Sequence, residues 1–192
     1  MKRLIVVLVM LLLCLPKAEA CVGKVLYIGV INSSEGQVLA EILSTIIRER
    51  TGTTVYTRVY KSSHDLYEDV KGKQVDIFVE NTAKALQVLH RAADPNMKRA
   101  YDTAKLSYER EKGLIWLKPF GFINGQGAEV QAYTAPVMKV EVLTDFPALP
   151  RVIEKLASAI NDETYVKLVK SVESGEKPQK VARDFLKSKK LI

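Results

Sequence analysis

The chain has 192 residues, of which 47% are hydrophobic and 27% charged, and its formal net charge is +7 at pH 7. This length suffices for one domain of ordinary size with a sizeable hydrophobic core. The basic residues are spread over the predicted helices and the C-terminal tail and are not gathered with aromatic residues, which argues against a nucleic-acid-binding surface.

Residues 1–20 have the features of a secretory signal. Two basic residues precede an apolar run at 4–15, and a small-x-small cleavage pattern follows at 18–20. The apolar run is shorter than the roughly 20 residues needed to span a bilayer. We therefore predict export to the periplasm or another extracytoplasmic compartment, with a mature chain over residues 21–192.

Cys21 directly follows the predicted cleavage site, so lipid attachment is an alternative to soluble export. A lipid-modified cysteine usually has a leucine three residues before it, and here Ala18 holds that position with Glu19 beside it. Soluble export is therefore the favoured interpretation. Cys14 leaves with the signal, so the mature chain keeps one cysteine and forms no internal disulfide.

Alternating strands and amphipathic helices predict an α/β fold. The first strand is an apolar, β-branched run, and the first helix has apolar residues at i, i+3 and i+4 spacing. The predicted strands are 24–31, 54–60, 75–79, 114–117 and 129–140, and the predicted helices are 36–50, 62–71, 80–91, 94–112, 147–160, 163–174 and 178–188. Short connections favour a mainly parallel sheet covered by helices. The last strand is the candidate for an antiparallel one.

No arrangement typical of a catalytic or metal-binding site occurs in the sequence. His64 and His90 are isolated and lack metal-ligand spacing such as HExxH. Neither a GxSxG elbow nor a P-loop is present. Gly121, Gly125 and Gly127 are not spaced like a dinucleotide-binding fingerprint. We therefore predict a protein that is not an enzyme and uses no metal or cofactor.

Four segments carry a family resemblance by their residues and their order. They are NSSE at 32–35, VDIFVENT at 75–82, APVMK at 135–139 and VARDFL at 181–186. Together they resemble the substrate-binding proteins of glycine betaine, choline and osmoprotectant ABC importers, which are type II periplasmic binding proteins. The resemblance implies a three-layer lobe with a mainly parallel central sheet of about five strands, flanked by helices, and with C-terminal helices packed on it.

The interval between the fourth and fifth strands departs from this family. Family members usually carry a second lobe of about a hundred residues there, which is the size of an ordinary small domain. Here a crossover at 119–133 takes its place. The resemblance therefore implies a single lobe, built from segments 21–118 and 134–192.

The candidate ligand-binding residues follow the carboxyl ends of strands, where open α/β sheets bind ligands. They are Asn32, Ser33, Ser34, Glu35, Gln37, Asn81, Thr82 and Tyr133. Helix capping is the alternative role for the serines, Asn81 and Thr82. In the family, aromatic faces hold a trimethylammonium group and two lobes close over it. Asn81 stands where the family has a tyrosine, and Tyr133 is the remaining cage candidate, since Tyr101, Tyr108 and Trp116 are best explained as core.

Two functions stay open. The first is an exported solute-binding component of an ABC importer of the glycine betaine/osmoprotectant type, which binds a small solute, such as a quaternary amine, and docks on the inner-membrane permease. The second is a one-lobed periplasmic docking protein that has lost solute binding. The face that a second lobe would cover could instead pair two copies into a homodimer. We expect no nucleic-acid partner.

Overall fold

In the computed structural model of the chain, residues 24–120, 122–123 and 132–192 are described. The predicted signal sequence, Cys21 and the middle of the predicted crossover lie outside these ranges. None of the helices in the described part of the chain combines the length and the apolar character needed to cross a membrane.

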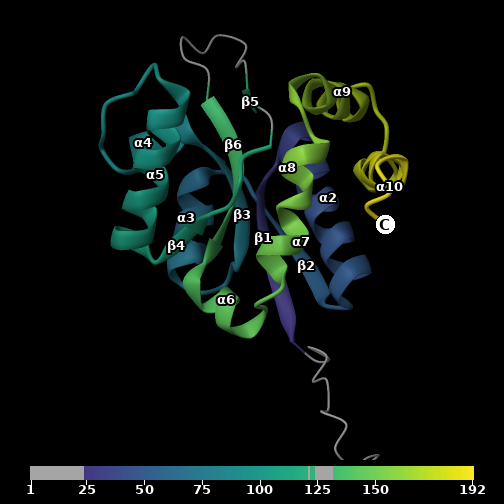
Figure 1. Cartoon of the computed structure of the whole chain (residues 1–192), viewed down its shortest axis with the longest axis horizontal. Helices are drawn as coiled ribbons and strands as arrows, with labels where there is room; N and C mark the ends of the chain where they lie inside the picture. Colours follow the sequence, from purple (N-terminus) through teal and green to yellow (C-terminus); the bar gives the residue numbers. More distant parts are fainter. Residues whose placement is uncertain (1–23, 121, 124–131) are drawn as a thin grey trace, which may run out of the picture.

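The centre of the fold is a sheet with strand order β2-β1-β3-β6-β4, and a short strand β5 also pairs with β6 (Figure 1). The strands are β1 Val25–Ile31, β2 Thr54–Tyr60, β3 Ile77–Asn81, β4 Leu114–Trp116, β5 Phe122–Ile123 and β6 Ala132–Lys139. β1 pairs in parallel with β2 and β3, whereas β6 runs antiparallel to β3 and β4. Four of the five main strands therefore point the same way. The mainly parallel sheet is confirmed, and the candidate antiparallel strand is the reversed one.

Helices cover both faces of the sheet and complete the three-layer α/β architecture (Figure 1). They are α2 Ser34–Thr51, α3 Ser63–Lys71, α4 Thr82–Val88, α5 Met97–Lys112, α6 Val140–Asp145, α7 Leu149–Ile153, α8 Lys155–Ala159, α9 Asp162–Glu173 and α10 Pro178–Ser188. α2 and α6 to α10 contribute to the core on one face, and α3, α4 and α5 contribute to a second core on the other. The predicted fold class is confirmed.

The core under α2 follows from two periodicities. Leu26, Ile28 and Val30 alternate along β1 and are all buried on this face, because successive strand side chains point to opposite sides. The apolar stripe of α2 lies on them, and α10 packs on α2 from outside, with Phe185 and Leu186 buried. The C-terminal helices are thus an integral part of this core.

The core under α5 is rich in aromatic rings. Tyr108 and Trp116 are 0% and 1% exposed, and their rings meet edge to face at 5.5 Å between centroids. Tyr101 lies 6.0 Å from Trp116 in the same manner and donates a hydrogen bond from its hydroxyl to the carbonyl of Leu117. The expectation that these three residues belong to the core is confirmed.

The border between the third strand and its helix differs from the prediction. The sequence suggested a strand at 75–79 and a helix at 80–91, but β3 continues to Asn81 and α4 starts one residue later. The reason is tertiary: pairing with β6 extends to the partners Asn81 and Thr134. Two polar residues that looked like the start of a helix therefore stand at the end of a strand.

The segment after β6 contains more helices than the sequence predicted. A short helix, α6, follows β6 directly, and the predicted helix 147–160 consists of α7 and α8. The two helices meet at Glu154, where the backbone keeps right-handed helical angles of φ −64° and ψ −14°. The separation is therefore local and leaves Ile153 and Leu156 buried in the same core.

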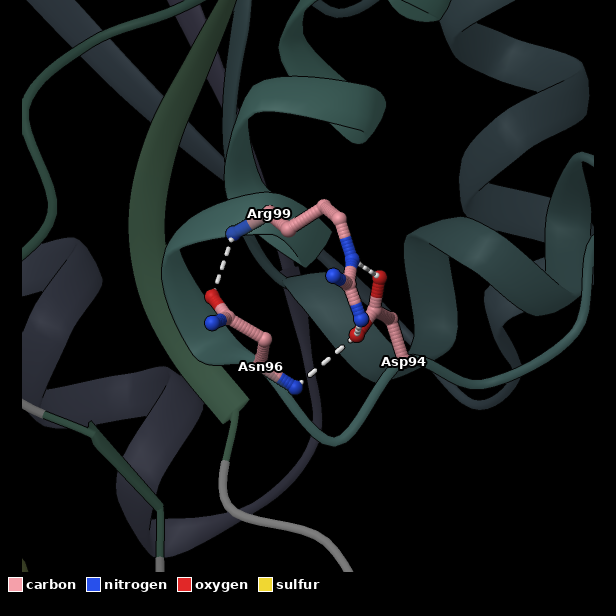
Figure 2. Close-up of polar contacts among 3 residues, drawn as sticks. All are labelled: Asp94, Asn96 and Arg99. Atoms are coloured by element: carbon pink, nitrogen blue, oxygen red, sulfur yellow. Dashed lines mark hydrogen bonds and ion pairs between the residues drawn. The ribbon is translucent and has the colours of Figure 1, made fainter.

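The start of α5 is fixed by polar contacts of three residues, shown in Figure 2. Asn96 is the N-cap, and its side-chain oxygen accepts from the amide of Arg99 at 2.9 Å. Asp94 accepts from the amide of Asn96 at 2.9 Å and forms a two-pronged ion pair with the Arg99 guanidinium. The predicted helix 94–112 therefore begins at Met97.

Candidate functional site

A small cavity of about 140 Å³ lies at the carboxyl edge of the sheet, beside the ends of β1 and β3. These strands are parallel, so both end at this edge, and each is followed at once by a helix. The polar residues that line the cavity are Ser33, Glu35, Glu80, Asn81, Lys84 and Thr134. This is the part of an open α/β fold where ligands bind as a rule.

Two N-cap residues fix the helix starts beside the cavity. The hydroxyl of Ser33 accepts from the amide of Gly36 at 3.0 Å, and the side-chain oxygen of Asn81 accepts from the amide of Lys84 at 2.9 Å. α2 begins so close to β1 that a Cβ at Gly36 would lie 2.3 Å from the carbonyl oxygen of Ile31. Only glycine at position 36 therefore allows α2 to start this close to β1 at the edge of the cavity.

Glu35 is held from the far end of the chain. The hydroxyl of Tyr165, on α9, donates a hydrogen bond to one of its carboxylate oxygens. Burial raises the pKa of Glu35, and the Tyr165 hydrogen bond and the charge of Lys84 offset part of that rise. Burial and the nearby Glu35 also raise the pKa of the Tyr165 hydroxyl, which stays a donor.

Glu80 is the more deeply buried carboxyl group, with 4% of its surface exposed. The hydroxyl of Tyr67 donates to it at 2.7 Å, and the amide of Asn81 donates at 2.9 Å. The Tyr67 hydroxyl also lies 2.6 Å from that of Tyr108. Burial raises the pKa of Glu80, while the charge of Lys84 and the Tyr67 hydrogen bond act in the opposite direction. A series of hydrogen-bonded polar groups, from Glu80 through Tyr67 to Tyr108, thus connects the cavity with the aromatic core.

Lys84 is the basic group of the cavity. Its ammonium forms no ion pair with any residue in the described ranges, yet its charge lowers the pKa of both Glu35 and Glu80. The three groups therefore form a charged cluster that ligand charges can complete. Two carboxyl groups with raised pKa values beside a lysine in a cavity are typical of a functional site.

Thr134 brings β6 to the cavity. Its side chain is 1% exposed, and its hydroxyl makes no hydrogen bond of normal geometry to the described residues. It lies near enough to the Tyr165 hydroxyl to influence the pKa of that group. Buried hydroxyl groups are nearly always hydrogen-bonded, so this one is an open position for a ligand or water.

The structure brings together three of the sequence-predicted site residues, namely Ser33, Glu35 and Asn81, which all line the cavity. Asn32 and Gln37 lie just outside, where the amide nitrogen of Gln37 donates to the side-chain oxygen of Asn32 at 3.0 Å. Ser34 and Thr82 are the first residues of α2 and α4. The helix-capping alternative holds for Ser33 and Asn81, which cap and line the cavity at once.

Tyr133 lies apart from these residues. Its ring packs edge to face against Tyr101 at 6.2 Å, on the α5 side of the sheet. Its neighbour Thr134 points to the opposite face, because side chains alternate along a strand. Tyr133 and the Glu35–Tyr165 pair therefore stand on different sides of β6.

Four residues of the site escaped the sequence analysis: Glu80, Lys84, Thr134 and Tyr165. Glu80 follows a buried strand, which is a usable signal, but it was assigned to a helix. Thr134 is marked only by its register opposite Asn81. Tyr165 lies 130 residues from Glu35, and no local pattern predicts their contact.

The three-layer fold is that of the periplasmic-binding-protein class. Residues 24–140 match the family described as the substrate binding domain of the ABC-type glycine betaine transport system. This match covers more than half of the chain, and the chain belongs to that family. No curated protein matches the chain.

Solved structures agree with this fold. Apo YehZ from Escherichia coli is 15% identical with a TM-score of 0.76, over 88% of this chain and 100% of that one. A glycine betaine/carnitine/choline ABC transporter structure is 14% identical with a TM-score of 0.77, over 88% and 98%. Lactococcal OpuAC, in its closed conformation with glycine betaine, is 8% identical with a TM-score of 0.59, over 87% and 96%.

Family membership gives the general function. The chain is a substrate-binding component of an ABC-type transport system, a family of binding proteins rather than enzymes. Among the described residues, no group of three or more histidine, cysteine, aspartate and glutamate side chains is arranged to hold a metal ion.

Proposed function

We propose that this chain is the exported solute-binding component of an ABC importer and that it binds a small amine solute of the glycine betaine class in the cavity at the carboxyl edge of the sheet. The observation that carries the proposal is the convergence of Glu35, Glu80 and Lys84 on this cavity. Family membership supplies the class of solute, and the inner-membrane permease is the partner that such a component serves.

The proposal includes export through the signal at 1–20 and a single lobe. The first lobe would be segments 21–118 and 134–192, with 119–133 as the crossover. The described ends of that crossover support a short link, because Phe122 and Ile123 of β5 pair with Tyr133 and Ala132 of β6. With no second lobe over it, the cavity stays in contact with water, so we expect weaker binding than in a closing two-lobed protein.

The test is thermal unfolding of the purified mature protein with millimolar glycine betaine, choline, carnitine and proline. A ligand at 100 times its dissociation constant adds about 2.7 kcal/mol to the free energy of unfolding. For a domain of this size that is a rise in Tm of several degrees. Lys84→Gln should abolish the rise, and Lys105→Gln, an exposed lysine on α5, should leave it unchanged.

A second candidate function is docking without solute binding. The observation in its favour is the edge strand β2, which exposes Tyr56 by 55% and Val59 by 58%. Failure of all four solutes to change the Tm would favour this function. The predicted homodimer has no support from the fold or the comparisons and is left out of both candidates.

A further inference from the structure

We propose that the cavity selects ligands whose nitrogen carries N–H groups, a primary or secondary ammonium on a small zwitterion, over fully methylated ones. This inference rests on the proposed function and narrows its ligand class. It follows from the kinds of side chain that line the cavity and from the buried hydroxyl of Thr134, which has no hydrogen bond of normal geometry to the described residues.

The lining of the cavity does not suit a trimethylammonium group. The described residues that line it include no aromatic ring, and aromatic faces are what attract a group that has charge but no hydrogen-bond donor. Tyr101 and Tyr133 pack against each other on the other side of β6.

Glu35 provides an acceptor that an N–H group on the ligand's nitrogen can use and an N-methyl group cannot. Tyr165 occupies one oxygen of Glu35, and the second oxygen has no hydrogen bond to the described residues. Both oxygens of Glu80 already accept a hydrogen bond, so Glu80 offers the ligand no free acceptor. An N–H of an ammonium ion can form a charge-assisted hydrogen bond with the second oxygen of Glu35. The methyl groups of a trimethylammonium ion keep its nitrogen away from that oxygen.

Lys84 and Thr134 provide the groups that can bind the carboxylate of a zwitterionic ligand. The ammonium of Lys84, which forms no ion pair with the described residues, suits the carboxylate of a zwitterion and lies in the same lining as Glu35. The buried hydroxyl of Thr134 can donate to that carboxylate or accept from the ligand's N–H. A ligand that leaves this hydroxyl unpaired forfeits an interaction that buried polar groups normally have.

The experiment is calorimetric titration of the mature protein with glycine, N-methylglycine, N,N-dimethylglycine and glycine betaine. Each of these four ligands has one carboxylate. They differ only in the number of N–H groups, which falls from three in glycine to none in glycine betaine as methyl groups replace the hydrogens. We expect affinity to fall along the series, by about tenfold or more overall, as the loss of one hydrogen bond to a charged group predicts.

Two variants and one control variant test which residues cause the selectivity. Glu35→Gln and Thr134→Val should each weaken glycine binding more than glycine betaine binding and so flatten the series. Glu109→Gln, an exposed carboxylate on α5, should leave it unchanged. Because Thr134→Val preserves shape, it keeps the test valid if Glu35→Gln disturbs the contact with Tyr165.

The outcomes separate the two proposals. Tightest binding of glycine betaine, or equal affinities along the series, would overturn the N–H selectivity and leave the solute-binding function standing. Binding of none of the four, together with no Tm change for choline, carnitine and proline, would overturn both.

Discussion

At the scale of single residues, Glu80 is the most consequential side chain of the site. It is buried at a strand end and receives hydrogen bonds from Tyr67 and from the amide of Asn81. Buried carboxyl groups favour the protonated form unless charges or hydrogen bonds compensate. Here burial dominates, so the pKa of Glu80 lies above its usual value of 4.5.

This direction predicts a pH-dependent effect of Glu80→Gln. The native state holds the Glu80 proton more tightly than the unfolded chain does, so the stability of the wild type falls as the pH rises from about 4.5 through the native pKa. Glutamine keeps an acceptor oxygen and does not ionise. We expect the Tm of the variant, relative to the wild type, to increase from pH 4 to pH 8 in calorimetric scans. A Tm difference that stays constant over this range would contradict the raised pKa.

Gly36 gives a prediction that runs against helix propensity. Alanine in a helix interior usually stabilises by up to about 1 kcal/mol relative to glycine. Here the added Cβ would lie 2.3 Å from the carbonyl oxygen of Ile31 and 2.8 Å from a methyl group of Val30. The steric cost of this overpacking should exceed the gain in helix propensity. We expect Gly36→Ala to lower the free energy of unfolding by about 1–3 kcal/mol in urea titrations.

Gly72→Ala is the matched control for this prediction. At Gly72 the added Cβ would come no closer than 3.2 Å to its nearest neighbour, the carbonyl oxygen of Glu68, and φ is −70°. Its effect should be clearly smaller than that of Gly36→Ala. Equal effects of the two substitutions would mean that α2 is not confined by β1 in the way described.

At the scale of elements, the site depends on strands that pass directly into capped helices. β1 ends before the N-cap Ser33, and the last residue of β3, Asn81, is itself the N-cap of α4. A sequence pattern identifies both strands and both helices here. The border between β3 and α4 was missed because the residues at 80–82 suit a helix start equally well, and only pairing with β6 extends the strand.

Two asparagine N-caps separate stability from ligand binding. Asn81 caps α4 at the cavity, and Asn96 caps α5 through the amide of Arg99 at 2.9 Å. Replacing either by alanine should cost about 1 kcal/mol of stability. Asn81→Ala should also weaken ligand binding in titration calorimetry, whereas Asn96→Ala should not. Loss of binding in both variants would point to global destabilisation instead of a local role for Asn81.

At the scale of the whole molecule, the C-terminal helices complete the core on one face. α10 packs on α2 (Figure 1). α9 carries Tyr165, whose hydroxyl holds Glu35 at the cavity. The family match ends at residue 140, so these helices lie beyond it and still contribute to the candidate site. Their packing couples the stability of the fold to the position of Glu35.

Two leucine truncations test how much the last helix contributes. Leu186 is 0% exposed in the α2 core, and Leu106 is 52% exposed on α5. Leu186→Ala should lower the free energy of unfolding by about 2–5 kcal/mol, because it leaves a cavity between packed helices. Leu106→Ala should change it by about 0.5 kcal/mol or less. Equal losses in chemical denaturation would show that α10 is not part of the cooperative core.

The sequence by itself determined the fold class, most elements and the edge of the sheet where Ser33, Glu35 and Asn81 meet. These follow from local hydrophobic periodicity and from the rule that parallel strands end at one edge. Only the tertiary structure decided which face Thr134 and Tyr133 take, and that Tyr165 holds Glu35. Those facts depend on strand register and on contacts across 130 residues, which local sequence patterns do not encode.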